Sequence, residues 1–106
     1  MEKQTTIKNK ITLKGKGLHT GQNVEVNILP AQANSGIVFK RIDLENPVLI
    51  KADAEAVSET SRGTTIESKG AKVATIEHLM AALYASNIDN ALIEISGEEV
   101  PILDGS

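Results

Sequence analysis

The sequence contains no cysteine and no tryptophan, and it has one phenylalanine, one tyrosine and two histidines among 106 residues. Without cysteine, the chain can form neither a disulfide nor a thiolate metal site, and it has no cysteine nucleophile. The lack of cysteine fits a reducing compartment. Because aromatic residues are so few, a hydrophobic core has to be built from Ile, Val, Leu and Ala.

Long hydrophobic runs and a strong excess of one charge are also missing. No apolar run reaches the length of a membrane span, and the N-terminus lacks the apolar centre of a signal peptide. The net charge of −3 argues against a nucleic-acid partner. Hydrophobic residues make up 41% of the chain, which is enough for one globular domain. We therefore expect a single cytoplasmic domain without a transmembrane segment.

One stretch, Thr75 to Tyr84, has clear helical periodicity. Its larger apolar residues recur at intervals of three and four and form one stripe, which consists of Ile76, Leu79, Met80 and Leu83. We expect Thr75 to cap the start of the helix and Asn87 to end it in a left-handed conformation. The other face carries Ala81, Ala82 and Ala85, here called the alanine face. So little polar surface predicts that a partner covers this face as well.

Alternating apolar and polar residues predict strands on both sides of this helix. The predicted strands are residues 5–14, 24–28, 37–41, 71–74 and 88–96, and residues 58–66 are polar and then extended. Residues 48–50 form an apolar run too short to classify. Residues 53–57 fit a helical turn or a strand, and irregular structure is favoured for them. The pattern predicts an α+β fold, in which an antiparallel-rich sheet carries one central helix. It does not give the order of the strands.

Three glycines within seven residues mark a tight connection from Gly15 to Gly21, with His19 at its tip. Two interpretations stay open: a polar hairpin turn, or a loop that presents His19 to a ligand. The strand before it carries a row of lysines at positions 8, 10 and 14. This row is either a solvated face or a surface that attracts an anion.

Glu77 and His78 lie in the first turn of the predicted helix. The positive end of the helix dipole favours a charged carboxylate and a neutral imidazole there, and a neutral imidazole can bind a metal. A structural interpretation is also open, in which Glu77 only complements the dipole and His78 packs at an interface. The pair does not form the H-E-x-x-H metalloprotease pattern, because no second histidine follows.

Four motifs together resemble one protein family. They are Gly-Leu-His-Thr-Gly at 17–21, Thr-Ile-Glu-His-Leu at 75–79, Ile-Asp-Asn at 88–90, and Glu-Val-Pro-Ile-Leu-Asp-Gly-Ser at 99–106. Along nearly its whole length the chain resembles the amino-terminal domain of UDP-3-O-acyl-N-acetylglucosamine deacetylase, the zinc enzyme of lipid A biosynthesis in Gram-negative bacteria. Family members have two similar α+β domains, with the helices sandwiched between two sheets. The resemblance implies that residues 1–106 are a truncated amino-terminal domain and that the second catalytic domain is absent.

The resemblance also implies roles for individual residues. The family removes the N-acetyl group of a UDP-linked acylated sugar by hydrolysis and releases acetate. By this resemblance, His78 is a zinc ligand and Glu77 is the carboxylate that activates water. The substrate-binding residues implied are Leu18, His19, Thr60 and Gly63. The sequence Arg62-Gly63 departs from many relatives, which carry an apolar residue followed by a small residue or Cys at this wall of the substrate passage.

The family's other two zinc ligands, a His and an Asp, and a further catalytic His belong to the second domain. We therefore expect the fragment alone to be inactive, to bind zinc weakly and to self-associate through the alanine face. Two other classes of function stay open. One is a noncatalytic binding domain of related fold. The other is an RNA-binding domain that uses the lysine row, against which the acidic balance and the missing stacking aromatics argue.

Overall fold

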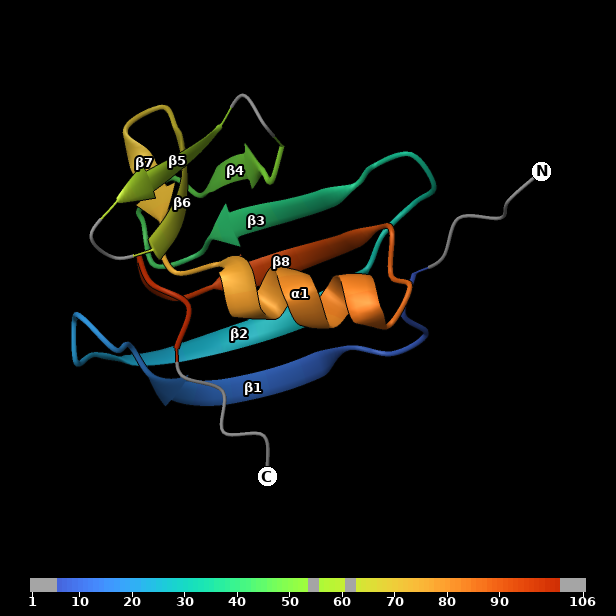
Figure 1. Ribbon diagram of the computed structural model, residues 1–106, viewed down its shortest axis with the longest axis horizontal. Helices are drawn as coiled ribbons and strands as arrows, with labels where there is room; N and C mark the ends of the chain where they lie inside the picture. Colours follow the sequence, from blue (N-terminus) through green and yellow to red (C-terminus); the bar gives the residue numbers. More distant parts are fainter. Residues whose placement is uncertain (1–5, 54–55, 61–62, 102–106) are drawn as a thin grey trace.

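The computed structural model describes residues 6–53, 56–60 and 63–101, and these residues form two sheets and one helix. The elements in chain order are β1 (Ile11–Lys16), β2 (Asn23–Pro30), β3 (Ile37–Arg41), β4 (Val48–Lys51), β5 (Val57–Thr60), β6 (Gly63–Ser68), β7 (Ala71–Val73), α1 (Glu77–Ala85) and β8 (Ala91–Ile95). Helix α1 lies across one face of the larger sheet, and the smaller sheet stands beside β3 and β4 (Figure 1).

The larger sheet has five strands in the order β1-β2-β8-β3-β4, and the smaller one has the order β5-β6-β7. All neighbouring strands are antiparallel except β3 and β8, which are parallel. The predicted α+β class with antiparallel-rich sheets and one helix is therefore confirmed. The last strand in the chain, β8, occupies the centre of the larger sheet, a position that sequence periodicity does not reveal.

The larger sheet buries one apolar face, as the alternation in the sequence predicted, and its other face mixes polar and apolar residues. One row across the five strands consists of Ile11, Ile28, Ile93, Phe39 and Ile50. All but the edge residue Ile11 are buried, and Leu79 and Leu83 of α1 belong to the same core. The adjacent row on the opposite face consists of Thr12, Asn27, Glu94, Lys40 and Leu49.

Several predicted boundaries were wrong. The first strand begins at Ile11 rather than at residue 5, and Ile11 is 44% exposed because β1 is an edge strand. Residues 53–57 were expected to be irregular, but Val57 already belongs to β5; residues 54–55 lie outside the described residues. The short apolar run at 48–50 lies in strand β4.

The sequence predicted the end of α1 correctly but not its start. Asn87 follows the helix with a φ of 59°, as expected of a left-handed stop. Thr75 is not the cap: the N-cap is Ile76, without a side-chain hydrogen bond. Instead, the Thr75 hydroxyl donates a hydrogen bond of 3.0 Å to the carboxylate of Glu99. The helix thus begins one residue later than the sequence pattern predicted, and Thr75 precedes its N-cap.

Arg41 connects the two sheets. Its side chain donates to both carboxylate oxygens of Asp43, at 2.8 and 2.7 Å, and to the backbone carbonyl of Lys72 in β7, at 2.8 Å. The hydrogen bond from Arg41 outweighs partial burial and, with the guanidinium charge, lowers the pKa of Asp43. A nearly buried charge is thus fully paired where the smaller sheet meets the larger one.

The assignment of the core predicts that substitutions on the neighbouring strands β3 and β4 differ strongly in their effect on stability. Phe39→Ala is expected to lower the free energy of unfolding by about 3–5 kcal/mol, because it leaves a cavity in a fully buried position. Leu49→Ala is the matched control, since Leu49 is 59% exposed on β4, and it should change stability by about 0.5 kcal/mol or less. Urea denaturation of both variants measures the difference; equal losses would contradict the assignment.

Candidate active site

Glu77 is the first residue of α1, and β6 holds its carboxylate in place. The backbone N–H of Thr64 donates to Glu77 Oε2 at 2.8 Å. The carbonyl of Thr64 accepts a hydrogen bond from the N–H of Ile76 at 3.1 Å. The start of the helix and the start of β6 are therefore joined through both backbone groups of one residue.

Gly63 provides the space in which this carboxylate lies. Its φ is +90°, and a Cβ built on it would lie 2.5 Å from Glu77 Oε1. A residue with a side chain in the same conformation would force the carboxylate to shift. The resemblance implied substrate binding for Gly63, and in the structure Gly63 lies against the carboxylate of Glu77. Thr60, also assigned to substrate binding, pairs with Gly63 across β5 and β6.

The hydrogen bonds around Glu77 favour its charged form. Partial burial opposes ionisation, but the N–H of Thr64, the backbone N–H of Glu77 itself and the neighbouring His78 together outweigh it and lower the pKa of Glu77. The position at the positive end of the helix dipole acts in the same direction. Glu77 is therefore a carboxylate at neutral pH and is available to accept a proton.

His78 is exposed on α1, outside the buried stripe of Leu79 and Leu83, as the helical periodicity predicted. Adjacent positions on a helix point about 100° apart, so Glu77 and His78 diverge from one start of the helix. Among the described residues, no group of three or more His, Asp or Glu side chains could hold a metal ion.

A second carboxylate, Glu99, has an organised environment that the sequence analysis did not predict. It lies in the segment after β8 and is fully buried. It accepts hydrogen bonds from the backbone N–H groups of His19 and Thr20, both at 3.0 Å, from His19 Nδ1 at 2.5 Å and from the Thr75 hydroxyl at 3.0 Å. Gly17 leaves room for this arrangement, since a Cβ there would collide with Glu99 Oε1 and Thr20 Oγ1.

These hydrogen bonds keep Glu99 ionised in spite of its burial. Desolvation opposes the charge, but the donors from Thr20, His19 and Thr75 outweigh it and lower the pKa of Glu99 from 4.5 to about 2. The sequence offered one signal for this role: Glu99 directly precedes the apolar run that begins at Val100. The apolar run draws the residue beside it into the interior, and the backbone N–H groups of a glycine-rich loop can there replace water around its charge.

Glu99 brings two distant motifs together. It binds the loop at His19 and also Thr75, two residues before Glu77. The segment around it pairs with the residue before Thr75, because the N–H of Ala74 donates to the carbonyl of Glu98 at 2.7 Å and the N–H of Val100 donates to Ala74 at 3.0 Å. Leu18, the other loop residue assigned to substrate binding, is 63% exposed. The side chain of Thr60 lies outside the described residues.

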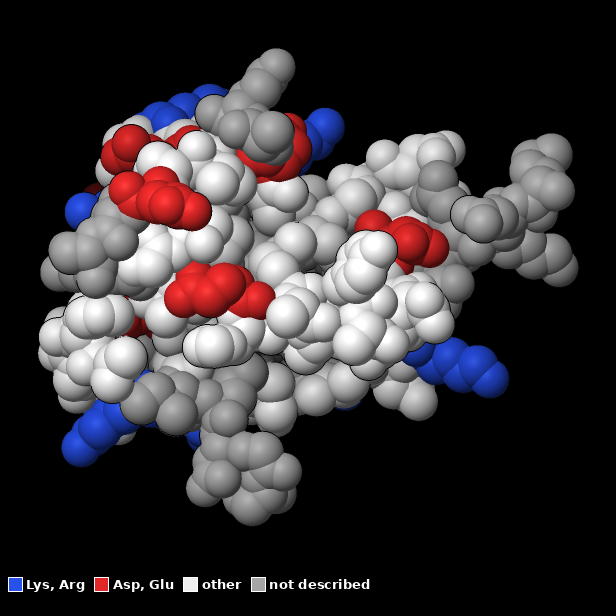
Figure 2. Space-filling model, viewed as in Figure 1, with Lys and Arg blue, Asp and Glu red and all other residues white. Residues whose placement is uncertain are grey.

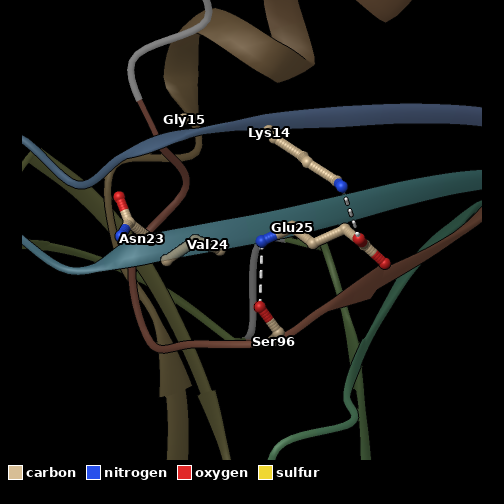
Figure 3. A pocket seen from close by; sticks show the side chains of 6 residues that line it. All are labelled: Lys14, Gly15, Asn23, Val24, Glu25 and Ser96. Atoms are coloured by element: carbon tan, nitrogen blue, oxygen red, sulfur yellow. Dashed lines mark hydrogen bonds and ion pairs between the residues drawn. The ribbon is translucent and has the colours of Figure 1, made fainter.

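The lysine row at positions 8, 10 and 14 is not held by a hydrogen-bond network of described residues like the one around Glu99. Lys14 pairs with Glu25 at 3.8 Å, and their side chains are 76% and 42% exposed, so the pair contributes little to stability. Both line a surface pocket of about 460 Å³ together with Gly15, Asn23, Val24 and Ser96 (Figure 3). None of the predicted site residues lines it. These contacts favour the solvated-face interpretation of the row.

The surface over α1 is largely uncharged. Figure 2 shows an acidic group near the end where the helix begins and white surface along its body. The residues of the alanine face are exposed, and Tyr84 beside them is 85% exposed. No helix in the described part of the chain is long and apolar enough to cross a membrane.

The fold and this site define a class: an α+β domain that presents a backbone-held carboxylate and an exposed imidazole at one helix start. Comparison with known proteins then identifies the family. Residues 4–106 match the LpxC family, described as UDP-3-O-acyl N-acetylglycosamine deacetylase. The chain belongs to this family, as the four motifs predicted.

Relatives share about half of their residues with this chain. It is 54% identical to the bifunctional enzyme LpxC/FabZ of Bacteroides thetaiotaomicron over 100% of its own length. It is 53% identical to the UDP-3-O-acyl-N-acetylglucosamine deacetylase of Geotalea uraniireducens over 97% of its length, and 51% identical to that of Saccharophagus degradans over 100%. The chain spans 23%, 34% and 35% of these three relatives, respectively.

The pKa of Glu99 predicts a pH-dependent contribution to stability. A carboxylate whose pKa falls from 4.5 to about 2 on folding stabilises the fold fully above pH 4.5 and loses this effect as the pH falls toward about 2. The contribution is at most about 3 kcal/mol. The difference in unfolding free energy between the wild type and Glu99→Gln should therefore shrink between about pH 6 and about pH 3.

Urea denaturation at several pH values measures this difference. Glu67→Gln, at an exposed position on β6, is the control for removing one negative charge, and its difference from the wild type should stay small throughout. A wild-type advantage over Glu99→Gln that is independent of pH would contradict the assignment of a buried, ionised Glu99.

Proposed function

We propose that the complete protein containing this chain removes the N-acetyl group from UDP-3-O-acyl-N-acetylglucosamine by hydrolysis, a step of lipid A biosynthesis. The observation that carries the proposal is the Glu77 carboxylate, held against β6 by Thr64 beside the exposed His78, in a chain of this family. The names of the relatives from Geotalea and Saccharophagus supply the substrate. The cytoplasmic location expected from the sequence stays a prediction.

Zinc is the metal that the resemblance implies, and the residues present fit one part of its site. His78 offers an exposed imidazole, which is a common zinc ligand, and Glu77 next to it is charged and fixed. Catalytic zinc sites use about three protein ligands, so the others would come from the second domain of the complete protein. Zinc, when bound, would polarise the amide carbonyl and lower the pKa of a water molecule.

Glu77 supplies the proton transfer in this reaction. Thr64 N–H is bound at Oε2, so we assign Oε1 as the oxygen that takes the proton from the attacking water. The water oxygen bonds to the acetyl carbon, the C–N bond breaks, and the proton passes to the leaving amine. The products are acetate and the free amino sugar. The glycine-rich loop, with Leu18 and His19, would contact the substrate beside this centre.

The alanine face is assigned to the second domain of the complete protein. Its residues and Tyr84 are exposed in this chain, while the opposite stripe is buried against the sheet. An apolar helix surface of this kind is normally covered by another element. On its own, the chain is expected to lack activity and to self-associate through the alanine face.

Glu77→Gln in the complete protein tests the proposal. Glutamine is nearly isosteric and can still accept the hydrogen bond from Thr64, but it cannot accept a proton. Turnover should therefore fall by roughly 10²–10⁴-fold, while zinc content and melting temperature stay near those of the wild type. The matched control is Glu67→Gln, which removes an exposed carboxylate from β6 and should leave turnover unchanged.

Deacetylation is measured with the UDP-linked substrate, and zinc by elemental analysis after dialysis. Near-normal turnover in a folded Glu77→Gln protein would reject the general-base assignment. Absence of turnover in the wild type itself would favour the noncatalytic binding domain.

A further inference from the structure

His19, in the loop after β1, binds one buried carboxylate through both its backbone and its side chain. Its Nδ1 lies 2.5 Å from Glu99 Oε2, and its backbone N–H lies 3.0 and 3.1 Å from the two oxygens of the same carboxylate. The side chain of Glu99 is 0% exposed, whereas that of His19 is 35% exposed. One edge of the imidazole therefore faces a buried charge, and the ring also reaches the surface.

The chemistry of these partners fixes the position of a hydrogen atom. An ionised carboxylate only accepts hydrogen bonds, so Nδ1 of His19 has to be the donor. In the neutral ring the other nitrogen, Nε2, then carries no hydrogen and is an acceptor. Among the described residues, no hydrogen bond to Nε2 is found. Glu99 thus selects one of the two tautomers of His19.

We propose that Glu99 is a positioning residue, whose buried carboxylate fixes the tautomer and orientation of His19 so that Nε2 is presented to the substrate. This inference rests on the proposed function, in which the loop at His19 contacts the substrate. The bond from Thr75 to the same carboxylate holds the imidazole at a fixed place relative to the start of α1.

Two residues around Glu99 are subject to a conformational or a steric restriction, which supports a role of this carboxylate beyond closing the loop. Thr75 is β-branched and has a φ of 63°, a conformation that such residues rarely adopt. Gly17 has to lack a side chain to admit the carboxylate. Strained residues of this kind persist where the surrounding contacts hold them, and they gather at functional sites.

The tautomer can be read directly by NMR. In the complete protein with ¹⁵N-labelled histidine, the ring signals of His19 are assigned by their loss in His19→Gln. We expect the wild-type signals to show hydrogen on Nδ1 at alkaline pH. In Glu99→Gln, the amide oxygen can accept from the N–H groups of His19 and Thr20, which turns the amide NH₂ toward Nδ1. The ring should then carry its hydrogen on Nε2.

Each outcome of this measurement decides the inference. A wild-type spectrum with hydrogen on Nε2 overturns it without any variant, so the test stands even if Glu99→Gln fails to fold. An unchanged tautomer in folded Glu99→Gln also overturns it. The control Glu67→Gln, which removes a distant exposed carboxylate, should keep the wild-type tautomer.

Kinetics separate positioning from a general effect on the fold. Glu99→Gln should lower kcat/KM by about tenfold or more, as expected for a disturbed hydrogen bond to a charged group. If Glu99 acts through His19, adding Glu99→Gln to His19→Ala should cause little further loss, because interacting residues are not additive. Losses that multiply would contradict the proposal. Absence of deacetylation in the wild type would reject the proposed function, while the NMR result would still test the tautomer.

Discussion

The buried charge of Glu99 is the constraint on which this structure depends. A carboxylate with no exposure is tolerated only when donors replace water, and three residues provide them here: His19, Thr20 and Thr75. Two of these belong to a glycine-rich loop and the third precedes the helix. The requirement to solvate one charge therefore fixes both motifs, and it explains why a polar loop at the surface has a defined conformation.

Sheet topology places that charge. Strand β8 lies between β2 and β3, so the chain that leaves it runs beside the end of β7 and pairs with Ala74. Glu99 thereby arrives between the loop after β1 and the first residues of α1. On the other side of the helix start, β6 places Thr64 and Gly63 against Glu77. Backbone pairing, rather than side-chain packing alone, sets the geometry of the candidate site.

The sequence predicted the parts of this structure that depend on local spacing. Helical periodicity identified the buried stripe and Asn87 as the stop, and alternation identified the faces of the larger sheet. The role of Glu99 was missed because its partner His19 is 80 positions away, and no periodic pattern encodes such a contact. Thr75 was misassigned for the same reason: its hydroxyl donates to Glu99, which is close in space but 24 positions away in the sequence.

The motifs that identified the family are also those that carry the long-range contacts. Gly-Leu-His-Thr-Gly supplies the donors to Glu99, Thr-Ile-Glu-His supplies Thr75 and Glu77, and the motif that begins at Glu99 supplies the acceptor. These motifs are far apart in the sequence and come into contact only when the sheet folds. Once it does, Glu99 joins the loop at His19 to Thr75, two residues before Glu77. On the other side of the helix start, Thr64 of β6 holds Glu77, and His78 next to it is exposed, so backbone contacts within the described residues orient the proposed proton acceptor.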